Sequence, residues 1–214
     1  VTNGLLYVTI GGVSNTSPTR LDYLEIRPGS LPSGSAAFVR EDAATHGSWQ
    51  GVYGADGYWF GNSVVCLPGY LTILGPREYS YTDLKKNTWA DPTTNARALQ
   101  HPWGNDRILS GWWASKGFEY DFNFVDGATH RVALYATDTG SARNAWTQRV
   151  DIVDAGDGTV LDSRTMTAFT DGTYLVWDIK GHVKLKVAPV KWNGIVNALF
   201  FGSGASLDSN GDDV

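Results

Sequence analysis

Alternation of apolar and polar residues is the main structural signal along this chain. In residues 118–124, four aromatic side chains alternate with three polar ones, so an extended strand there would have one apolar and one polar face. Residues 174–179 and 183–187 show the same period of two. Residues 195–201 are nearly all apolar and predict a central strand buried on both faces. No window shows the 3.6-residue period of an amphipathic helix.

Asp-Gly dipeptides punctuate this pattern and predict tight turns, because Asp-Gly readily takes the positive φ angles of two-residue hairpin loops. They occur at Asp56-Gly57, Asp126-Gly127, Asp157-Gly158 and Asp171-Gly172. Short alternating strands joined by tight turns predict an all-β fold, and specifically a jelly-roll β-sandwich of two antiparallel sheets. No internal repeat of fixed period is visible, which argues against a propeller or a solenoid.

Composition divides the chain into three predicted parts. Residues 1–35 are rich in Gly, Ser, Thr and Pro and are interpreted as an N-terminal linker or edge appendage. Residues 36–202 carry the alternating pattern and are predicted to form the β-sandwich module. Residues 203–214 are small and acidic, and they predict a C-terminal linker. Since the chain starts at Val1 without a signal peptide, we interpret it as a processed protein or an excised module.

Charge and cysteine content narrow the class of partner. The net charge is −5, from 17 basic and 22 acidic residues, and no basic stripe is present. Nucleic acid and membrane are therefore not expected partners, and no apolar run reaches the length of a membrane span. The single cysteine, Cys66, excludes an intramolecular disulfide and any C-x-x-C motif.

The tryptophan content suggests a recognition surface. The chain has nine Trp and ten Tyr residues, which is more than a core of this size needs. Flat aromatic faces suit sugar rings, whose axial C–H bonds form apolar patches between hydroxyls. The alternative, which stays open for each ring, is that it fills the core.

Two regions supply the candidate binding residues. The glycine-rich segment 45–60 lets the backbone lie close to the surface and present its rings. Trp103 stands between Pro and Gly in a predicted loop, while Trp113 follows Trp112 and must point to the opposite face of a strand. Arg107 is a candidate donor to sugar hydroxyls or uronate carboxylates. The expected ligand-binding residues are thus Trp49, Tyr53, Tyr58, Trp59, Trp103, Trp113, Trp192 and Arg107.

The order of several segments resembles a bacterial accessory β-sandwich module of the kind found beside secreted glycoside hydrolases or polysaccharide lyases. The resemblance covers roughly residues 36–202 and rests on these segments: 45–58, 106–108, 122–123, 126–127, 130–135, 174–177 and 197–201. It implies a non-catalytic module that binds a polysaccharide or oligosaccharide, is covalently linked to a catalytic module, and is extracellular. Trp59 stands where this resemblance implies an aliphatic residue.

Catalysis is the first alternative. A jelly-roll glycoside hydrolase or polysaccharide lyase of this size would place two carboxylates across a cleft. Of the four glutamates, Glu78 and Glu119 are the candidates, but neither lies in a recognisable hydrolase motif, and the four histidines lack metal-ligand spacing. We therefore expect no catalytic residues and no required cofactor. A structural spacer or interaction domain is the second alternative.

Calcium is a separate possibility. Asp208, Asn210 and Asp212 form a D-x-N-x-D run like the start of an oxygen-ligand loop, although the sequence ends before a twelfth-position Glu. The segment is either an acidic linker or the start of a calcium-binding repeat. A structural calcium ion elsewhere in the sandwich is also possible, with ligands that the sequence does not identify.

Overall fold

Every regular element of the described chain is a β-strand. The computed structural model describes residues 34–78, 83–138 and 145–203, which all belong to the second of two units along the chain, Pro32–Val214. No helix within these ranges is long and apolar enough to cross a membrane. The predicted all-β fold is therefore confirmed.

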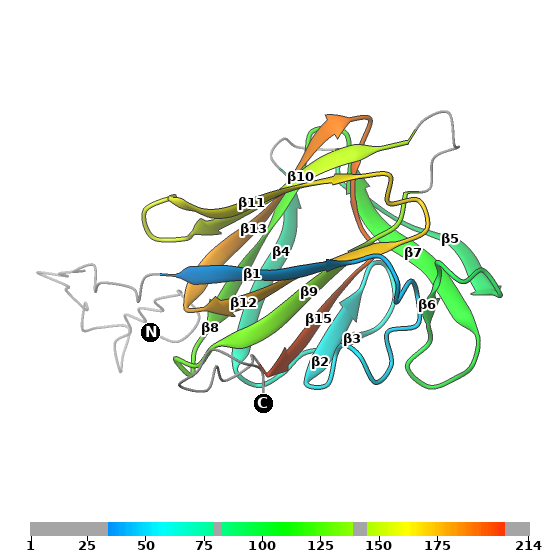
Figure 1. Ribbon diagram of the computed structural model, residues 1–214, viewed down its shortest axis with the longest axis horizontal. Helices are drawn as coiled ribbons and strands as arrows, with labels where there is room; N and C mark the ends of the chain where they lie inside the picture. The colour runs from blue at the N-terminus through cyan, green and yellow to red at the C-terminus, as the bar shows by residue number, and fades with distance from the viewer. Residues whose placement is uncertain (1–33, 79–82, 139–144, 204–214) are drawn as a thin grey trace, which may run out of the picture. The chain divides into compact units, whose positions relative to one another are not determined.

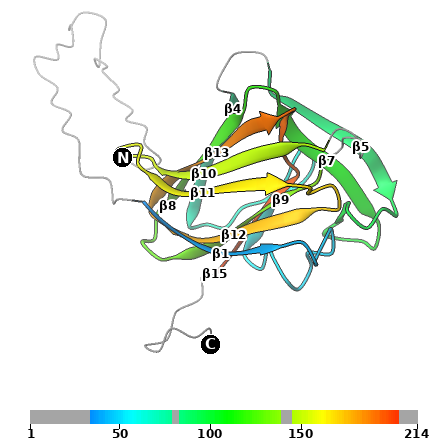
Figure 2. The same cartoon turned by 45° about the horizontal axis from the view of Figure 1, so that its top comes forward.

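Two large antiparallel sheets form the sandwich. The six-stranded sheet has the order β1 (Ser35–Asp42), β12 (Thr173–Lys180), β9 (His130–Ala136), β15 (Ala198–Ser203), β2 (Gly57–Phe60) and β3 (Val65–Cys66). The five-stranded sheet has the order β11 (Val160–Thr167), β10 (Thr147–Asp154), β13 (His182–Lys191), β8 (Phe118–Phe124) and β4 (Leu71–Glu78). Figure 1 and Figure 2 show the two sheets as separate layers, with β10 and β11 over β1 and β12.

Most connections cross from one sheet to the other, as in a jelly roll. Of the four Asp-Gly dipeptides, only Asp157-Gly158 closes a hairpin, between β10 and β11. Asp126-Gly127 and Asp171-Gly172 lie where the chain changes sheets, and Asp56-Gly57 leads into β2. The dipeptides thus mark changes of direction, but they do not identify which strands pair.

The core between the sheets is largely aromatic. The four rings of β8 all face inward and are buried, as the alternation predicts. Tyr120 lies near Trp59 of β2 (6.0 Å between ring centroids), and Phe122 lies edge-on to Phe201 of β15 (6.1 Å). Burial of apolar surface stabilises such a core by about 25 cal/mol per Å² removed from water.

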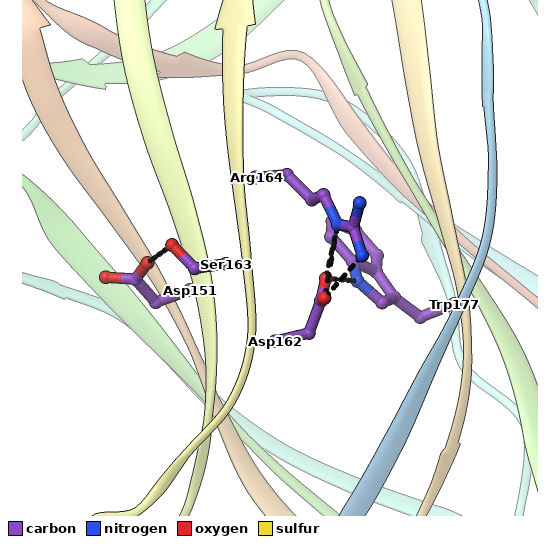
Figure 3. Close-up of polar contacts among 5 residues, drawn as sticks. All are labelled: Asp151, Asp162, Ser163, Arg164 and Trp177. Atoms are coloured by element: carbon purple, nitrogen blue, oxygen red, sulfur yellow. Dashed lines mark hydrogen bonds and ion pairs between the residues drawn. The ribbon is translucent and has the colours of Figure 1, made fainter.

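A polar contact joins the two sheets at one side of this core (Figure 3). The indole of Trp177, on β12, donates from Nε1 to Asp162 Oδ2 of β11 (2.7 Å). Arg164 donates to the same carboxylate (2.7 Å), and its guanidinium lies 3.8 Å from the centre of the Phe38 ring on β1. The bonds from Arg164 and Trp177 outweigh burial and hold the pKa of Asp162 below its usual value.

A further, four-stranded sheet was not predicted. It consists of β14 (Gly194–Val196), β7 (Arg107–Ala114), β5 (Lys85–Thr93) and β6 (Leu99–Gln100), and it lies at one end of the sandwich (Figure 1). The single strand predicted over residues 195–201 is therefore wrong. The chain pairs with β7 as far as Val196, breaks at Asn197, and then enters the six-stranded sheet as β15.

At this break, the buried side chain of Asn197 bonds to the residue after β9 and to β7. Its Oδ1 accepts a hydrogen bond from the Thr137 amide (2.7 Å), and its Nδ2 donates to the Ser110 carbonyl (2.6 Å). On the other side of β14, buried Gln148 forms two bonds with the backbone of Ile195 (2.7 and 3.0 Å). These two amide side chains fasten the four-stranded sheet to both large sheets.

The buried tyrosines allow a test of this account of the core. The Tyr120 hydroxyl is fully buried and has no hydrogen-bond partner among the described residues, whereas Tyr135 donates to the Arg97 carbonyl (2.6 Å). An unsatisfied buried polar group costs about 1–3 kcal/mol. We expect Tyr120→Phe to leave the free energy of unfolding in urea unchanged or to raise it. Tyr135→Phe should lower it by about 1–2 kcal/mol. Equal losses in both variants would show that Tyr120 has a partner, such as a buried water.

Candidate functional site

The loop between β6 and β7 presents an exposed tryptophan. It is closed at its base by the His101 amide, which donates to the Asp106 carbonyl (3.0 Å). Trp103 lies inside this loop with 70% of its surface exposed. One side of its ring packs on His101, with centroids 5.4 Å apart and planes inclined by 33°. The ring is thus supported from below and open to solvent, as a stacking surface must be.

His101 anchors this loop to its surroundings. Its side chain is buried, and Nε2 lies 2.9 Å from Asp91 Oδ1 at the end of β5. Its carbonyl accepts a hydrogen bond from Gln50 Nε2 (2.8 Å). Asp106 completes a cluster in which one ligand-type atom from each of Asp91, His101 and Asp106 lies within 4.8 Å of the others. The base of the loop is therefore polar and held from two sides.

Two depressions are lined by residues close to Trp103 in sequence, although Trp103 itself lines neither. The smaller, of ≈ 370 Å³, includes Pro102 and is otherwise lined by Trp49, Gln50, Gly51, Val52, Tyr53, Gly54, Ala55 and Tyr58. The larger, of ≈ 560 Å³, is lined by Pro92, Thr93, Thr94, Asn105, Asp106 and Arg107. The larger depression thus offers hydroxyl, amide and carboxylate groups.

Arg107 lines the larger depression, but its guanidinium is engaged by the protein. Nη1 donates to the Ala98 carbonyl (2.9 Å), and Nη2 donates to Ser48 Oγ (2.8 Å). These bonds tie the start of β7 to two neighbouring segments. The predicted bidentate contact with a uronate would have to displace them.

Trp49 and Tyr53 do not present their rings, contrary to the prediction for segment 45–60. They are only 5% and 7% exposed, respectively. Tyr53 stacks on Tyr174 (4.3 Å between centroids), and Trp49 packs on Phe200 (5.1 Å) while its Nε1 donates to the Gln100 carbonyl (2.8 Å). The segment folds back over the outer face of the six-stranded sheet and builds a second apolar cluster there. The glycines therefore permit this fold-back rather than exposure.

Tyr58 and Trp59 are half-buried on opposite faces of β2. Tyr58 packs on Trp49 in the outer cluster (5.2 Å between centroids) and lines the smaller depression. Trp59 packs edge-on to Trp112 (5.1 Å) in the core between the sheets. Trp59 therefore packs against the core, whereas Tyr58 lines a surface depression.

Trp113 and Trp192 line neither depression. Trp113 is half-buried on β7, where Nε1 donates to Asn87 Oδ1 (2.8 Å) and the Lys85 ammonium lies 5.0 Å from the ring centre. Trp192 is 56% exposed in the turn after β13, with a φ of 68° that non-glycine residues rarely adopt. The structure thus offers Trp192 as a second, separate exposed ring.

Sequence reasoning missed Asp91, His101 and Asp106. Asp91 reaches the loop because β5 and β7 pair with two irregularities, which place Thr93 opposite Arg107. No spacing rule gives that pairing. The predicted calcium run at Asp208, Asn210 and Asp212 lies outside the described residues, and the possibility of a structural calcium stays a prediction.

Known proteins offer only a distant structural similarity. No family model and no curated protein matches the sequence. Among solved structures, the chain is similar to the all-β carbohydrate-binding module TmCBM61, which was solved in complex with beta-1,4-galactotriose. The TM-score is 0.35 and the sequence identity is 15%, over 64% of this chain and 90% of that module.

Asp42 gives a pH-dependent test of the outer cluster. Burial alone would raise its pKa, but hydrogen bonds from Thr45, Tyr53 and Ala44 lower it from 3.8 to about 2. Its contribution to stability is therefore complete above pH 3.8 and is lost as the pH falls through about 2. We expect the difference in unfolding free energy between wild type and Asp42→Asn to be smaller at pH 2 than at pH 6 in urea titrations.

Tyr53→Phe serves as the companion variant, because it removes one of these donors (2.6 Å from Tyr53 Oη to Asp42 Oδ2). In that background the loss should begin at a higher pH. An Asp42→Asn difference that is the same at pH 2 and pH 6 would contradict the argument.

Proposed function

We propose that this chain is a non-catalytic carbohydrate-binding module that holds a polysaccharide on the surface around Trp103. The observation that carries the proposal is the exposed indole of Trp103, 70% accessible, on a loop that is closed by backbone hydrogen bonds and supported by His101. A pyranose ring would stack on the open side of this indole.

Hydroxyl recognition would come mainly from the larger depression. Thr93, Thr94, Asn105 and Asp106 line it and offer both donors and acceptors. The loop is already ordered by its internal bonds, so little conformational entropy is lost when a sugar binds. A smaller contribution would come from Gln50 and Tyr58, which line the depression on the Pro102 side.

A single exposed ring gives a weak site. Aromatic stacking contributes on the order of 1 kcal/mol per contact, so we expect affinities in roughly the micromolar to millimolar range. Covalent linkage to another module that contacts the same polymer raises the effective concentration of the binding site on that polymer. The overall affinity then exceeds that of the isolated site. We infer that the module belongs to a secreted bacterial polysaccharide-degrading enzyme, is covalently linked to its catalytic module, and acts outside the cell.

Replacement of Trp103 tests the site directly. We expect Trp103→Ala to weaken polysaccharide binding by at least about tenfold, while the unfolding free energy stays within roughly 0.5–1 kcal/mol of wild type because the ring is on the surface. Affinity gel electrophoresis against neutral and uronate-bearing polysaccharides would measure the first quantity, and urea unfolding would measure the second.

Trp192→Ala is the matched control, because it removes another exposed indole, in the turn after β13, whose neighbours in sequence line neither depression. Trp49→Ala is the core control and should cost about 3–5 kcal/mol of stability. Loss of binding in Trp192→Ala with full binding in Trp103→Ala would move the site to the β13–β14 turn. No loss in either variant would refute a tryptophan platform on these loops.

The catalytic alternative is tested at Glu119. This residue lies on β8 with its carboxylate 3.5 Å from Lys184 Nζ and 4.0 Å from Lys186 Nζ, while the side chain of Glu78 lies outside the described residues. We expect no reducing ends and no absorbance at 235 nm after incubation with the same polysaccharides. Turnover that disappears in Glu119→Gln would overturn the non-catalytic assignment.

A further inference from the structure

Three metal-ligating side chains meet at the base of the Trp103 loop, where His101 also packs on the Trp103 ring. They come from three places in the chain: Asp91 from β5, His101 from the residue after β6, and Asp106 from the residue before β7. One imidazole nitrogen and one oxygen from each carboxylate all lie within 4.8 Å of one another. Within the described part of the chain, this is the only group of three such side chains.

His101 supplies the imidazole of this cluster. Its side chain is 7% exposed, so it is more than nine-tenths buried. Nε2 contacts Asp91, while Nδ1 is buried and has no hydrogen-bond partner among the described residues. Nε2 is the ring nitrogen that faces the Asp91 carboxylate, and a neutral imidazole nitrogen is a good metal ligand.

The cluster is held in place by the backbone. The His101 amide donates to the Asp106 carbonyl (3.0 Å), and the His101 carbonyl accepts from Gln50 (2.8 Å). Gly104 packs against the Asp106 carboxylate so closely that a Cβ there would lie 2.7 Å from Oδ1. The donor atoms thus require little rearrangement to converge on an ion.

The charge of the cluster favours a cation. Two carboxylates approach each other here, and in the described ranges neither forms an ion pair with a lysine or arginine. The neighbouring Arg107 directs its guanidinium to the Ala98 carbonyl and to Ser48. A divalent cation would compensate both negative charges at once.

We propose that Asp91, His101 and Asp106 form a binding site for a divalent cation of the zinc class. One imidazole nitrogen with two carboxylate oxygens suits a borderline metal ion such as Zn²⁺, whereas calcium and magnesium prefer oxygen ligands alone. Three protein ligands leave a coordination position open to water. The ion joins β5 to the β6–β7 loop and fixes the base of the Trp103 platform.

Calorimetric titration of ZnCl₂ into the EDTA-treated full chain, without a histidine tag, tests the proposal. We expect one zinc ion per chain, with affinity reduced at least tenfold in Asp106→Asn and in Asp91→Asn. Asp121→Asn is the matched control. It breaks another histidine–aspartate pair, His182 Nε2 to Asp121 Oδ1 at 2.6 Å, which no third ligand joins in the described ranges. Zinc affinity in this control should equal that of wild type.

A second measurement locates the ion without relying on these variants. Cobalt(II) bound at the site lies next to the Trp103 ring and should quench its fluorescence, so the quenched part of the emission should be missing in Trp103→Phe. Absence of zinc binding, unchanged affinity in Asp106→Asn and Asp91→Asn, or binding of CaCl₂ but not ZnCl₂ would each overturn the proposal. Because these readouts need no sugar, they are independent of whether the chain binds carbohydrate.

Discussion

Two buried amide side chains determine where the candidate site lies. Gln148 fastens β14 to the five-stranded sheet, and Asn197 connects the same region to the six-stranded sheet and to β7. Loss of either side chain leaves two backbone groups unsatisfied, at about 1–3 kcal/mol per group. The residue after β2 also packs closely against β7, since a Cβ on Gly61 would lie 2.4 Å from the Gly111 Cα. The Trp103 loop leads into β7, so its position rests on these contacts.

The fold divides the tryptophans into those that fill apolar clusters and those that are exposed and available for binding. Trp49, Trp112 and Trp177 are buried, and Trp59, Trp113 and Trp146 are half-buried. The surplus that suggested a recognition surface therefore serves mainly to fill two apolar clusters, one between the large sheets and one outside the six-stranded sheet. Trp89, Trp103 and Trp192 remain exposed, and of these only Trp103 stands on a loop whose other residues line two depressions.

The period-two alternation predicted the all-β fold class because a strand that buries one face of a sheet must have apolar residues at every second position. The strand over residues 118–124 has the inward rings that its sequence requires. The same reasoning failed at residues 195–201, because an apolar run does not reveal that Asn197 will be buried and hydrogen-bonded to Thr137, after β9, and to Ser110 of β7. It also failed for Trp49 and Tyr53, where glycine-rich sequence is compatible with rings that turn either outward or inward. Local sequence limits the conformations that a segment can adopt, and the residues that pack against it determine which of these conformations forms.

The same limit explains why Trp103 could be predicted but the cluster at the base of its loop could not. Pro102 and Gly104 place Trp103 in a loop by local chemistry alone, and His101 and Asp106 are near it in sequence. Asp91 is brought in by the irregular pairing of β5 with β7, which shifts register twice between Thr88 and Thr93. Each irregularity changes which residues of β5 lie opposite β7. With regular pairing, a different residue would face His101, so the cluster is a product of the sheet's irregularities rather than of any motif.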